Sequence, residues 1–168
     1  MALPQQIILV GMPGSGKSTL GKRLAALLSC PFVDLDEVIE KQENSLIKDI
    51  FRHSGEDQFR MIEHFALAST LGRNPRMVMA TGGGTPRFHD NMDLINARAV
   101  SVFLDTPMDK IVSRIHANED RPLIVSDNID ELREEMTQVY ADRLPYYQKA
   151  TYTTDKQTPE AILALVKS

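Results

Sequence analysis

The chain alternates between short, continuously apolar runs and longer stretches in which apolar residues recur every three or four positions. The first apolar run covers residues 7–10 and includes the β-branched Ile7, Ile8 and Val10. Such a run is typical of a strand that is buried on both faces of a parallel sheet. After a glycine-rich turn, residues 17–28 carry leucine and alanine at helical spacing. The N-terminal segment is therefore predicted to be a strand, a loop and a helix.

The same alternation continues along the rest of the chain. Further strands are predicted at residues 32–33, 77–80, 100–104 and 151–153. Further helices are predicted at residues 47–51, 59–71, 89–96 and 129–147, with two more beginning near Pro107 and Pro159. The polar and irregular residues 117–127 are predicted to form a mobile loop.

Strands that alternate with helices in this way predict an α/β protein. The expected architecture is a three-layer α/β/α sandwich, in which a parallel sheet is covered on both faces through right-handed crossovers. Ligands are expected at the carboxyl ends of the strands. The 168 residues contain no internal repeat, low-complexity tract or linker-like stretch, so residues 1–168 are predicted to form a single domain.

Composition and charge exclude several classes of protein. With 42% hydrophobic and 25% charged residues, the chain has the composition of an ordinary soluble globular protein. A formal net charge of −4 argues against a general nucleic-acid surface, which needs clustered excess Lys and Arg. The apolar run at residues 7–10 is too short for a signal peptide or a membrane span, and the lone Cys30 cannot form an intrachain disulfide. We therefore expect a cytoplasmic protein with neither a nucleic-acid nor a membrane partner.

Residues 11–18 match the phosphate-loop pattern G-x-x-x-x-G-K-[ST] between a predicted strand and a predicted helix. Glycines let successive backbone N–H groups face one anion, and the helix adds its positive N-terminal end. Lys17 is expected to bridge the β- and γ-phosphates of ATP, and Ser18 to be a ligand of Mg²⁺. The predicted nucleotide-binding residues here are Gly14, Ser15, Gly16, Lys17, Ser18 and Thr19. The pattern predicts a nucleotide without fixing the reaction, because switches, ATPases and kinases all use it.

Two carboxylates, Asp34 and Asp36, stand at the end of the second predicted strand. At this spacing both side chains share one face while the strand lasts and diverge where the chain turns. One of them could instead cap a following helix, since Asp is a favoured N-cap residue. The pair by itself leaves both interpretations open.

Further motifs follow the phosphate loop and the D-x-D pair in a fixed order. They are G-x-x-x-F-R-x-x-E at residues 55–63, T-G-G-G at 81–84, R-P-L at 121–123 and R-x-P-x-Y at 143–147. Together these motifs resemble the shikimate kinase family, from about residue 5 to the C-terminus. The resemblance implies a P-loop NTPase fold like that of nucleoside monophosphate kinases, with five parallel strands in the order 2-3-1-4-5. It also implies phosphorylation of the 3-hydroxyl of shikimate by MgATP.

The resemblance assigns roles to the charged motif residues. Asp36 would hold the shikimate hydroxyls and orient, or accept a proton from, the attacking one. Asp34 would orient Mg²⁺ through water. Arg60 and Arg143 would grip the shikimate carboxylate with their planar guanidinium groups. Glu63, three residues after Arg60 on a predicted helix, could steady that arginine through an ion pair.

The remaining implied roles concern the walls of the site. The substrate-binding helical region would span about residues 35–63, with Phe51 and Phe59 against the shikimate ring, although isolated phenylalanines at helical spacing also suit a core. The backbone of Gly82, Gly83 and Gly84 would close on the substrate. Arg121 would reach the transferring phosphate from a lid loop at about residues 116–127, and Arg114 would stack on adenine. Residues 154–159 resemble the loop on the adenine side but lack an arginine that several relatives have there.

Three other functions compete with this interpretation. A nucleotide kinase shares the loop and the sheet but would need a nucleotide-binding insert and an arginine pattern that this chain lacks. A gluconate-type kinase is similar in size, yet T-G-G-G and R-x-P-x-Y argue against it. A noncatalytic relative should have lost catalytic residues, and all of them are present. We therefore expect a monomeric kinase whose partners are shikimate, ATP and Mg²⁺.

Overall fold

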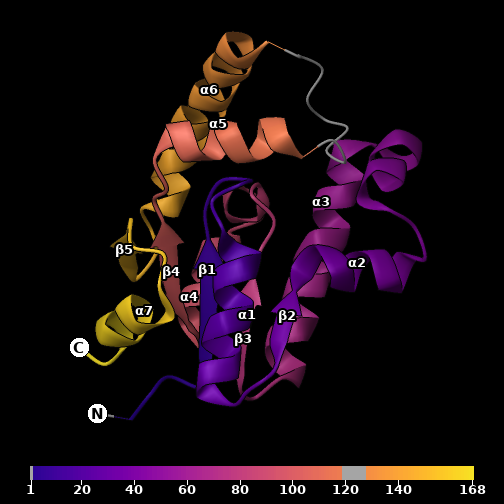
Figure 1. Ribbon diagram of the computed structural model, residues 1–168. Coiled ribbons are helices and arrows are strands. Elements are labelled where there is room, and N and C mark those ends of the chain that lie inside the picture. Colours follow the sequence, from indigo (N-terminus) through magenta and orange to yellow (C-terminus); the bar gives the residue numbers. More distant parts are fainter. Residues whose placement is uncertain (1, 119–127) are drawn as a thin grey trace.

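The computed structural model describes residues 2–118 and 128–168. Its centre is a five-stranded parallel sheet in the order β2-β3-β1-β4-β5, as expected (Figure 1). The strands are β1 (Gln6–Val10), β2 (Phe32–Asp34), β3 (Met77–Ala80), β4 (Val100–Leu104) and β5 (Tyr152–Thr154). Because β1 lies between β3 and β4, the chain changes direction across the sheet at β1, and this is where open α/β sheets bind ligands.

Helices cover both faces of the sheet, so the predicted α/β/α architecture is confirmed. The elements are α1 (Lys17–Leu28), α2 (Leu35–Glu43), α3 (Ile47–Arg73), the 3-10 turn η1 (Thr85–Arg87), α4 (Asn91–Arg98), α5 (Met108–Ala117), α6 (Ile129–Tyr147) and α7 (Pro159–Val166). α1 and α7 pack on one face, and residues of α2 to α6 form the apolar core on the other.

The central strand β1 divides its apolar side chains between the two cores. Ile7 and Leu9 pack with α1 and α7, whereas Ile8 and Val10 pack with the larger cluster on the other face. All four are at most 1% exposed. Successive side chains of a strand point to opposite faces, so a continuously apolar run fills both cores at once.

Several element boundaries differ from those predicted. α2 was not predicted as a separate element. The helices predicted at 47–51 and 59–71 are joined as α3, with a break at Gly55, whose φ of 80° is left-handed. α4 begins at residue 91 rather than 89, because His89 and Asp90 both have positive φ. β5 begins one residue later than predicted.

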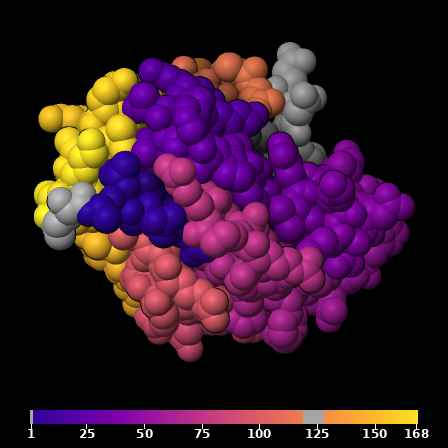
Figure 2. All heavy atoms as spheres, turned by 90° about the horizontal axis from the view of Figure 1, so that it is seen from below, coloured from indigo at the N-terminus to yellow at the C-terminus, as the bar shows by residue number. Residues whose placement is uncertain are grey.

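The two ends of the chain lie close together, away from the carboxyl ends of the strands (Figure 1). From below, the N-terminal and C-terminal segments are neighbours on the surface (Figure 2). Leu3 packs against the cluster that contains Ile162 and Val166 of α7. None of the helices in the described ranges is long and apolar enough to cross a membrane.

Candidate active site

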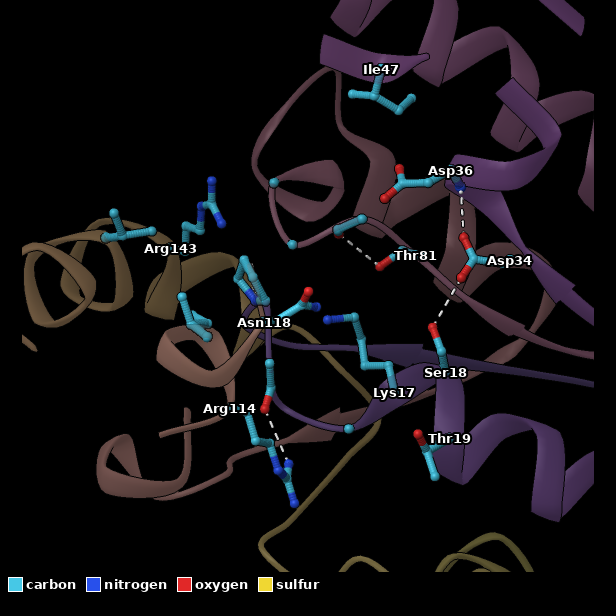
Figure 3. A pocket seen from close by; sticks show the side chains of 18 of the residues that line it. Lys17, Ser18, Thr19, Asp34, Asp36, Ile47, Thr81, Arg114, Asn118 and Arg143 are labelled. Carbon is cyan, nitrogen blue, oxygen red and sulfur yellow. Dashed lines mark hydrogen bonds between the residues drawn. The ribbon is translucent and has the colours of Figure 1, made fainter. Parts of the chain in front are cut away.

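A pocket of about 1170 Å³ lies at the carboxyl ends of the strands (Figure 3). It is lined by the phosphate loop, the starts of α1 and α2, α3, the glycine triplet after β3, α5, α6 and the loop before α7. These segments bring most of the predicted residues to one place: Gly14, Gly16, Lys17, Ser18, Thr19, Asp34, Asp36, Phe51, Phe59, Arg60, Gly82, Gly83, Gly84, Arg114 and Arg143. Ser15, within the phosphate loop, is fully buried and does not line the pocket. Arg121 and most of the predicted lid lie outside the described residues.

The phosphate loop turns the chain from β1 into α1. Gly16, with φ of 97°, precedes the first residue of α1, and no side chain caps this helix end. A side chain is disfavoured at such a φ, so glycine is needed at this position. An N-terminus without a side-chain cap leaves backbone N–H groups directed at the pocket, where an anion can satisfy them.

Lys17 emerges from this loop and is only 8% exposed. Its Nζ donates hydrogen bonds of 2.8 Å to the carbonyl oxygens of Gly11 and Met12. The loop carbonyls thus hold the ammonium group at the pocket, and its side chain extends into the cavity (Figure 3). A cation held there can neutralise phosphate charge.

Asp34 caps a helix and also lines the pocket. Its Oδ1 accepts hydrogen bonds from the backbone N–H groups of Asp36 (3.0 Å) and Glu37 (3.3 Å), and so caps α2. Its Oδ2 accepts a 2.9 Å hydrogen bond from Ser18 Oγ at the phosphate loop (Figure 3). The first carboxylate oxygen thus fixes where α2 begins, and the second faces the phosphate loop.

The Ser18–Asp34 pair has donors that suit Mg²⁺. A hydroxyl and a carboxylate are hard oxygen ligands, which this ion prefers, and Mg²⁺ in kinases is completed by water and substrate phosphates. Within the described ranges, no group of three or more His, Cys, Asp or Glu side chains could hold a metal ion. The remaining ligands of a Mg²⁺ at this pair would be water and nucleotide phosphates.

Asp36 lies in the first turn of α2 and faces the pocket (Figure 3). Burial, together with the nearby charges of Asp34 and Glu63, raises the pKa of its carboxyl to about 6, against the opposing effect of Lys17. Burial and like charges both disfavour the ionised form. A carboxyl with this pKa is suited to accept a proton near neutral pH.

The glycine triplet at 82–84 lies against three of the predicted substrate-binding side chains. A Cβ on the first glycine would lie 3.0 Å from Asp36 Oδ1, and one on the second 2.6 Å from Pro13 Cδ and 3.0 Å from an Arg143 guanidinium nitrogen. A Cβ on the third would lie 2.6 Å from a guanidinium nitrogen of Arg60. Side chains here would displace the charged groups, so the triplet is needed for close approach rather than for a turn.

The R-x-P-x-Y motif contributes a second residue besides Arg143. Tyr147 is fully buried, its ring stacks on Phe103 with centroids 4.9 Å apart, and its hydroxyl donates a 2.6 Å hydrogen bond to the carbonyl of Gly83. Burial raises the pKa of this tyrosine to about 12, so its hydroxyl keeps its proton and remains a donor. The motif therefore also anchors the backbone of the glycine triplet.

The nucleotide side of the pocket contains a residue that the sequence did not single out. Arg114 donates to the carbonyl of Gly14 (3.1 Å) and to Gln157 Oε1 (2.9 Å). Gln157 Nε2 in turn donates to the carbonyl of Ser15 (3.0 Å). Gln157 belongs to the segment 154–159, so that segment does meet the phosphate loop.

Other residues of the pocket were also missed. Met136 and Val139 line it from α6. Phe88 is not part of the lining but packs on Arg60, which is, with 4.2 Å from its ring centroid to the guanidinium carbon. Apolar residues at helical spacing carry no signal that separates a pocket wall from a core. Phe88 stands in a short irregular segment, where sequence pattern says nothing about its neighbours.

Comparisons with known proteins agree with this geometry. The protein-family model for shikimate kinase matches residues 13–167. A shikimate kinase from Clostridium botulinum (strain Loch Maree / Type A3) is 36% identical over 167 residues, which cover 98% of this chain and 95% of the relative. One from Vibrio parahaemolyticus is 38% identical over 165 residues, which cover 96% and 94% of the two chains.

Solved structures are similar over the same extent. A shikimate kinase from Bacteroides thetaiotaomicron has a TM-score of 0.93 at 31% identity, covering 98% of this chain and 99% of that one. One from Acinetobacter baumannii in complex with shikimate has a TM-score of 0.88 at 32% identity, covering 99% and 94%. The family match, the sequence alignments and the structural alignments thus all cover nearly the whole chain. This chain belongs to the shikimate kinase family.

Proposed function

We propose that this protein transfers the γ-phosphate of ATP to the 3-hydroxyl of shikimate, giving shikimate 3-phosphate and ADP. One observation carries the proposal. A single pocket combines a phosphate loop with a partly buried carboxylate, Asp36, and two arginines, Arg60 and Arg143. The phosphate loop suits a nucleoside triphosphate, and Asp36 with the two arginines suits a small acceptor that has hydroxyls and a carboxylate. The Acinetobacter baumannii relative solved with shikimate supports this acceptor.

At the phosphate end, backbone N–H groups of Gly14 to Thr19 hold the phosphates of ATP, and Lys17 neutralises the β- and γ-phosphates. Ser18 would be a ligand of Mg²⁺, and Asp34 would orient the ion through water. When bound, Mg²⁺ neutralises phosphate charge that develops during transfer. The 2.9 Å hydrogen bond between the Ser18 and Asp34 side chains supports their acting at the same ion.

At the acceptor end, Arg60 and Arg143 bind the shikimate carboxylate, and their planar groups set its orientation. Phe51 and Phe59, whose ring centroids lie 4.5 Å apart, form an apolar wall for the shikimate ring. The backbone of the triplet 82–84 lies against the same space. The acceptor is thereby placed with its hydroxyls toward Asp36.

The transfer forms a bond between the 3-hydroxyl oxygen and the γ-phosphorus and breaks the bond from that phosphorus to the β-γ bridging oxygen. Asp36 orients the hydroxyl or accepts its proton, and the raised pKa of its carboxyl supports the second role. The bridging oxygen leaves on ADP. Positioning and charge neutralisation provide most of the acceleration in such reactions.

On the nucleotide side, Arg114 stacks on adenine, and Gln157 holds that arginine by a 2.9 Å hydrogen bond. Arg121 reaches the transferring phosphate from a lid at about residues 116–127, a role that rests on the resemblance of the R-P-L motif. Closing a lid excludes water, which would otherwise accept the phosphoryl group. The enzyme is proposed to act as a cytoplasmic monomer, because one chain supplies the described pocket and Cys30 has no cysteine partner.

An ADP-release assay tests the proposed function. Purified protein is given MgATP with shikimate, quinate, AMP, CMP or gluconate in parallel. ADP release that depends on shikimate, with much slower release for the other acceptors, is expected. Faster turnover with AMP or CMP would make the protein a nucleotide kinase, and turnover with gluconate would make it a sugar-acid kinase.

A further inference from the structure

The guanidinium of Arg60 is enclosed on nearly every side. The residue is only 7% exposed, although it carries a full charge. One terminal nitrogen donates to Glu63 Oε1 at 2.9 Å, and the other lies 3.4 Å from Glu56 Oε1. Within the described ranges its Nε has no hydrogen-bond partner, although it is buried. A buried donor without a partner is costly unless a ligand satisfies it, so the orientation of this group matters for binding.

Glu63 is held from its other side by a residue with no role assigned so far. Its side chain is 1% exposed, and its Oε2 accepts a 2.7 Å hydrogen bond from the hydroxyl of Thr85. Thr85 itself is fully buried. Because each oxygen of the carboxylate has one donor, Glu63 cannot rotate without losing either Arg60 or Thr85. The hydroxyl therefore fixes the carboxylate that fixes the arginine.

The backbone that carries Thr85 is fixed in turn. The buried side chain of Asn91 donates from Nδ2 to the carbonyl of Thr85 at 2.9 Å. Its Oδ1 lies 2.7 Å from Nδ1 of His64, which belongs to the same helix as Arg60. The segment that follows the glycine triplet is thus tied to α3 at two points, through Glu63 and through His64.

A second contact of this segment sets the plane of the guanidinium. The ring centroid of Phe88 lies 4.2 Å from the central carbon of Arg60, nearer than the rings of Phe59 (5.1 Å) and Phe51 (5.8 Å). Gly84 approaches the same group closely, since a Cβ there would lie 3.0 Å from that carbon. An aromatic ring and a glycine backbone therefore restrict how the group can turn.

We propose that Thr85 and Phe88 are positioning residues that set the orientation in which Arg60 receives the acceptor carboxylate. Bidentate hydrogen bonds to a carboxylate form only in the plane of the guanidinium, so residues that fix this plane fix where the acceptor binds. Thr85 acts through Glu63, and Phe88 acts directly on the face of the group. This inference rests on the proposed function and extends it to the segment after the glycine triplet.

Paired substitutions at Thr85 test the proposal. Thr85→Val keeps the shape but removes the donor, whereas Thr85→Ser keeps the donor. Thr85→Val is expected to raise the KM for shikimate about tenfold with a small change in the KM for ATP, because a hydrogen bond to a charged group is lost. Thr85→Ser is expected to stay within about threefold of the parent. The Kd for shikimate, measured by calorimetry without turnover, should rise in Thr85→Val and stay close to the parent value in Thr85→Ser.

Substitutions at Phe88 provide a second, independent test if Thr85→Val folds poorly. Phe88→Leu, which removes the aromatic face, is expected to weaken shikimate binding ~3–10-fold, whereas Phe88→Tyr should bind like the parent. Unchanged shikimate affinity in both Thr85→Val and Phe88→Leu, or equal losses for shikimate and ATP, overturns the proposal. Absence of shikimate-dependent ADP release by the parent protein would instead overturn the proposed function.

Discussion

Replacing Asp36 by Asn should make this enzyme much slower and at the same time more stable. The substitution keeps the size of the side chain and removes the charge that burial and three neighbouring carboxylates oppose. Activity should fall because the amide cannot accept a proton from the attacking hydroxyl. A positioned general base is worth ~10²–10⁴-fold in turnover, and ATP affinity should change little.

The gain in stability follows from the raised pKa of Asp36. The folded-state pKa is about 6, against an ordinary value of 3.8, so the folded protein binds this proton more tightly than the unfolded chain. The ionised carboxyl therefore costs stability as pH rises from about 4 to 6, and the full cost is present at pH 7. At 1.36 kcal/mol per pKa unit, and with a discount for partial exposure, the cost is about 1–3 kcal/mol.

Chemical unfolding of the parent and of Asp36→Asn at two pH values measures this cost. The variant should be more stable by about 1–3 kcal/mol at pH 7 and by about half as much at pH 5, where much of the carboxyl is already protonated in the folded state. Turnover by the parent protein should decline as pH falls below about 6, following the pKa of Asp36. A variant that was less stable than the parent at pH 7, or a difference that did not change with pH, would refute this reasoning.

Other substitutions separate the remaining roles. Lys17→Ala should abolish transfer while leaving the fold intact, because the ammonium group serves phosphate; near-normal activity in a folded variant would contradict the phosphate-loop assignment. Arg60→Ala and Arg143→Ala should each weaken shikimate binding by ~10-fold or more and ATP binding far less, measured by calorimetry, and equal losses would indicate a structural role. Asp34→Asn should lose activity that added Mg²⁺ partly restores, whereas Asp36→Asn should not respond to Mg²⁺. If added Mg²⁺ restored the turnover of Asp36→Asn and not that of Asp34→Asn, the roles assigned to Asp34 and Asp36 would have to be exchanged.

Features that depend on neighbouring residues in the chain could be predicted from sequence. The phosphate loop is one, because Gly16 and Lys17 act through the backbone and the helix that immediately follow them. The apolar run that became β1 is another, since its length and composition suit a strand buried on both faces. Motif order then predicted which distant residues share a site, and the pocket contains nearly all the predicted residues in the described ranges.

Boundaries failed where a local conformation opposed the pattern. The predicted start of α4 at His89 was wrong, because that residue and Asp90 adopt positive φ before the helix begins. α2 lies at the start of the helical region expected at about residues 35–63, and the two hydrogen bonds from its backbone to Asp34 fix where it begins. The positive φ of His89 and Asp90 does not follow from the spacing of apolar residues.

Only the tertiary structure decided how the site residues are held. Nothing in the sequence relates Thr85 to Glu63, and the resemblance of residues 154–159 to an adenine-side loop does not show that Gln157 contacts Ser15, because these contacts join residues that are far apart in the chain. They exist because packing of α3 and the two sheet faces brings separate loops to one edge of the sheet. A motif specifies which groups are present and what its own backbone does, whereas the orientation of a buried charge such as Arg60 depends on everything packed around it.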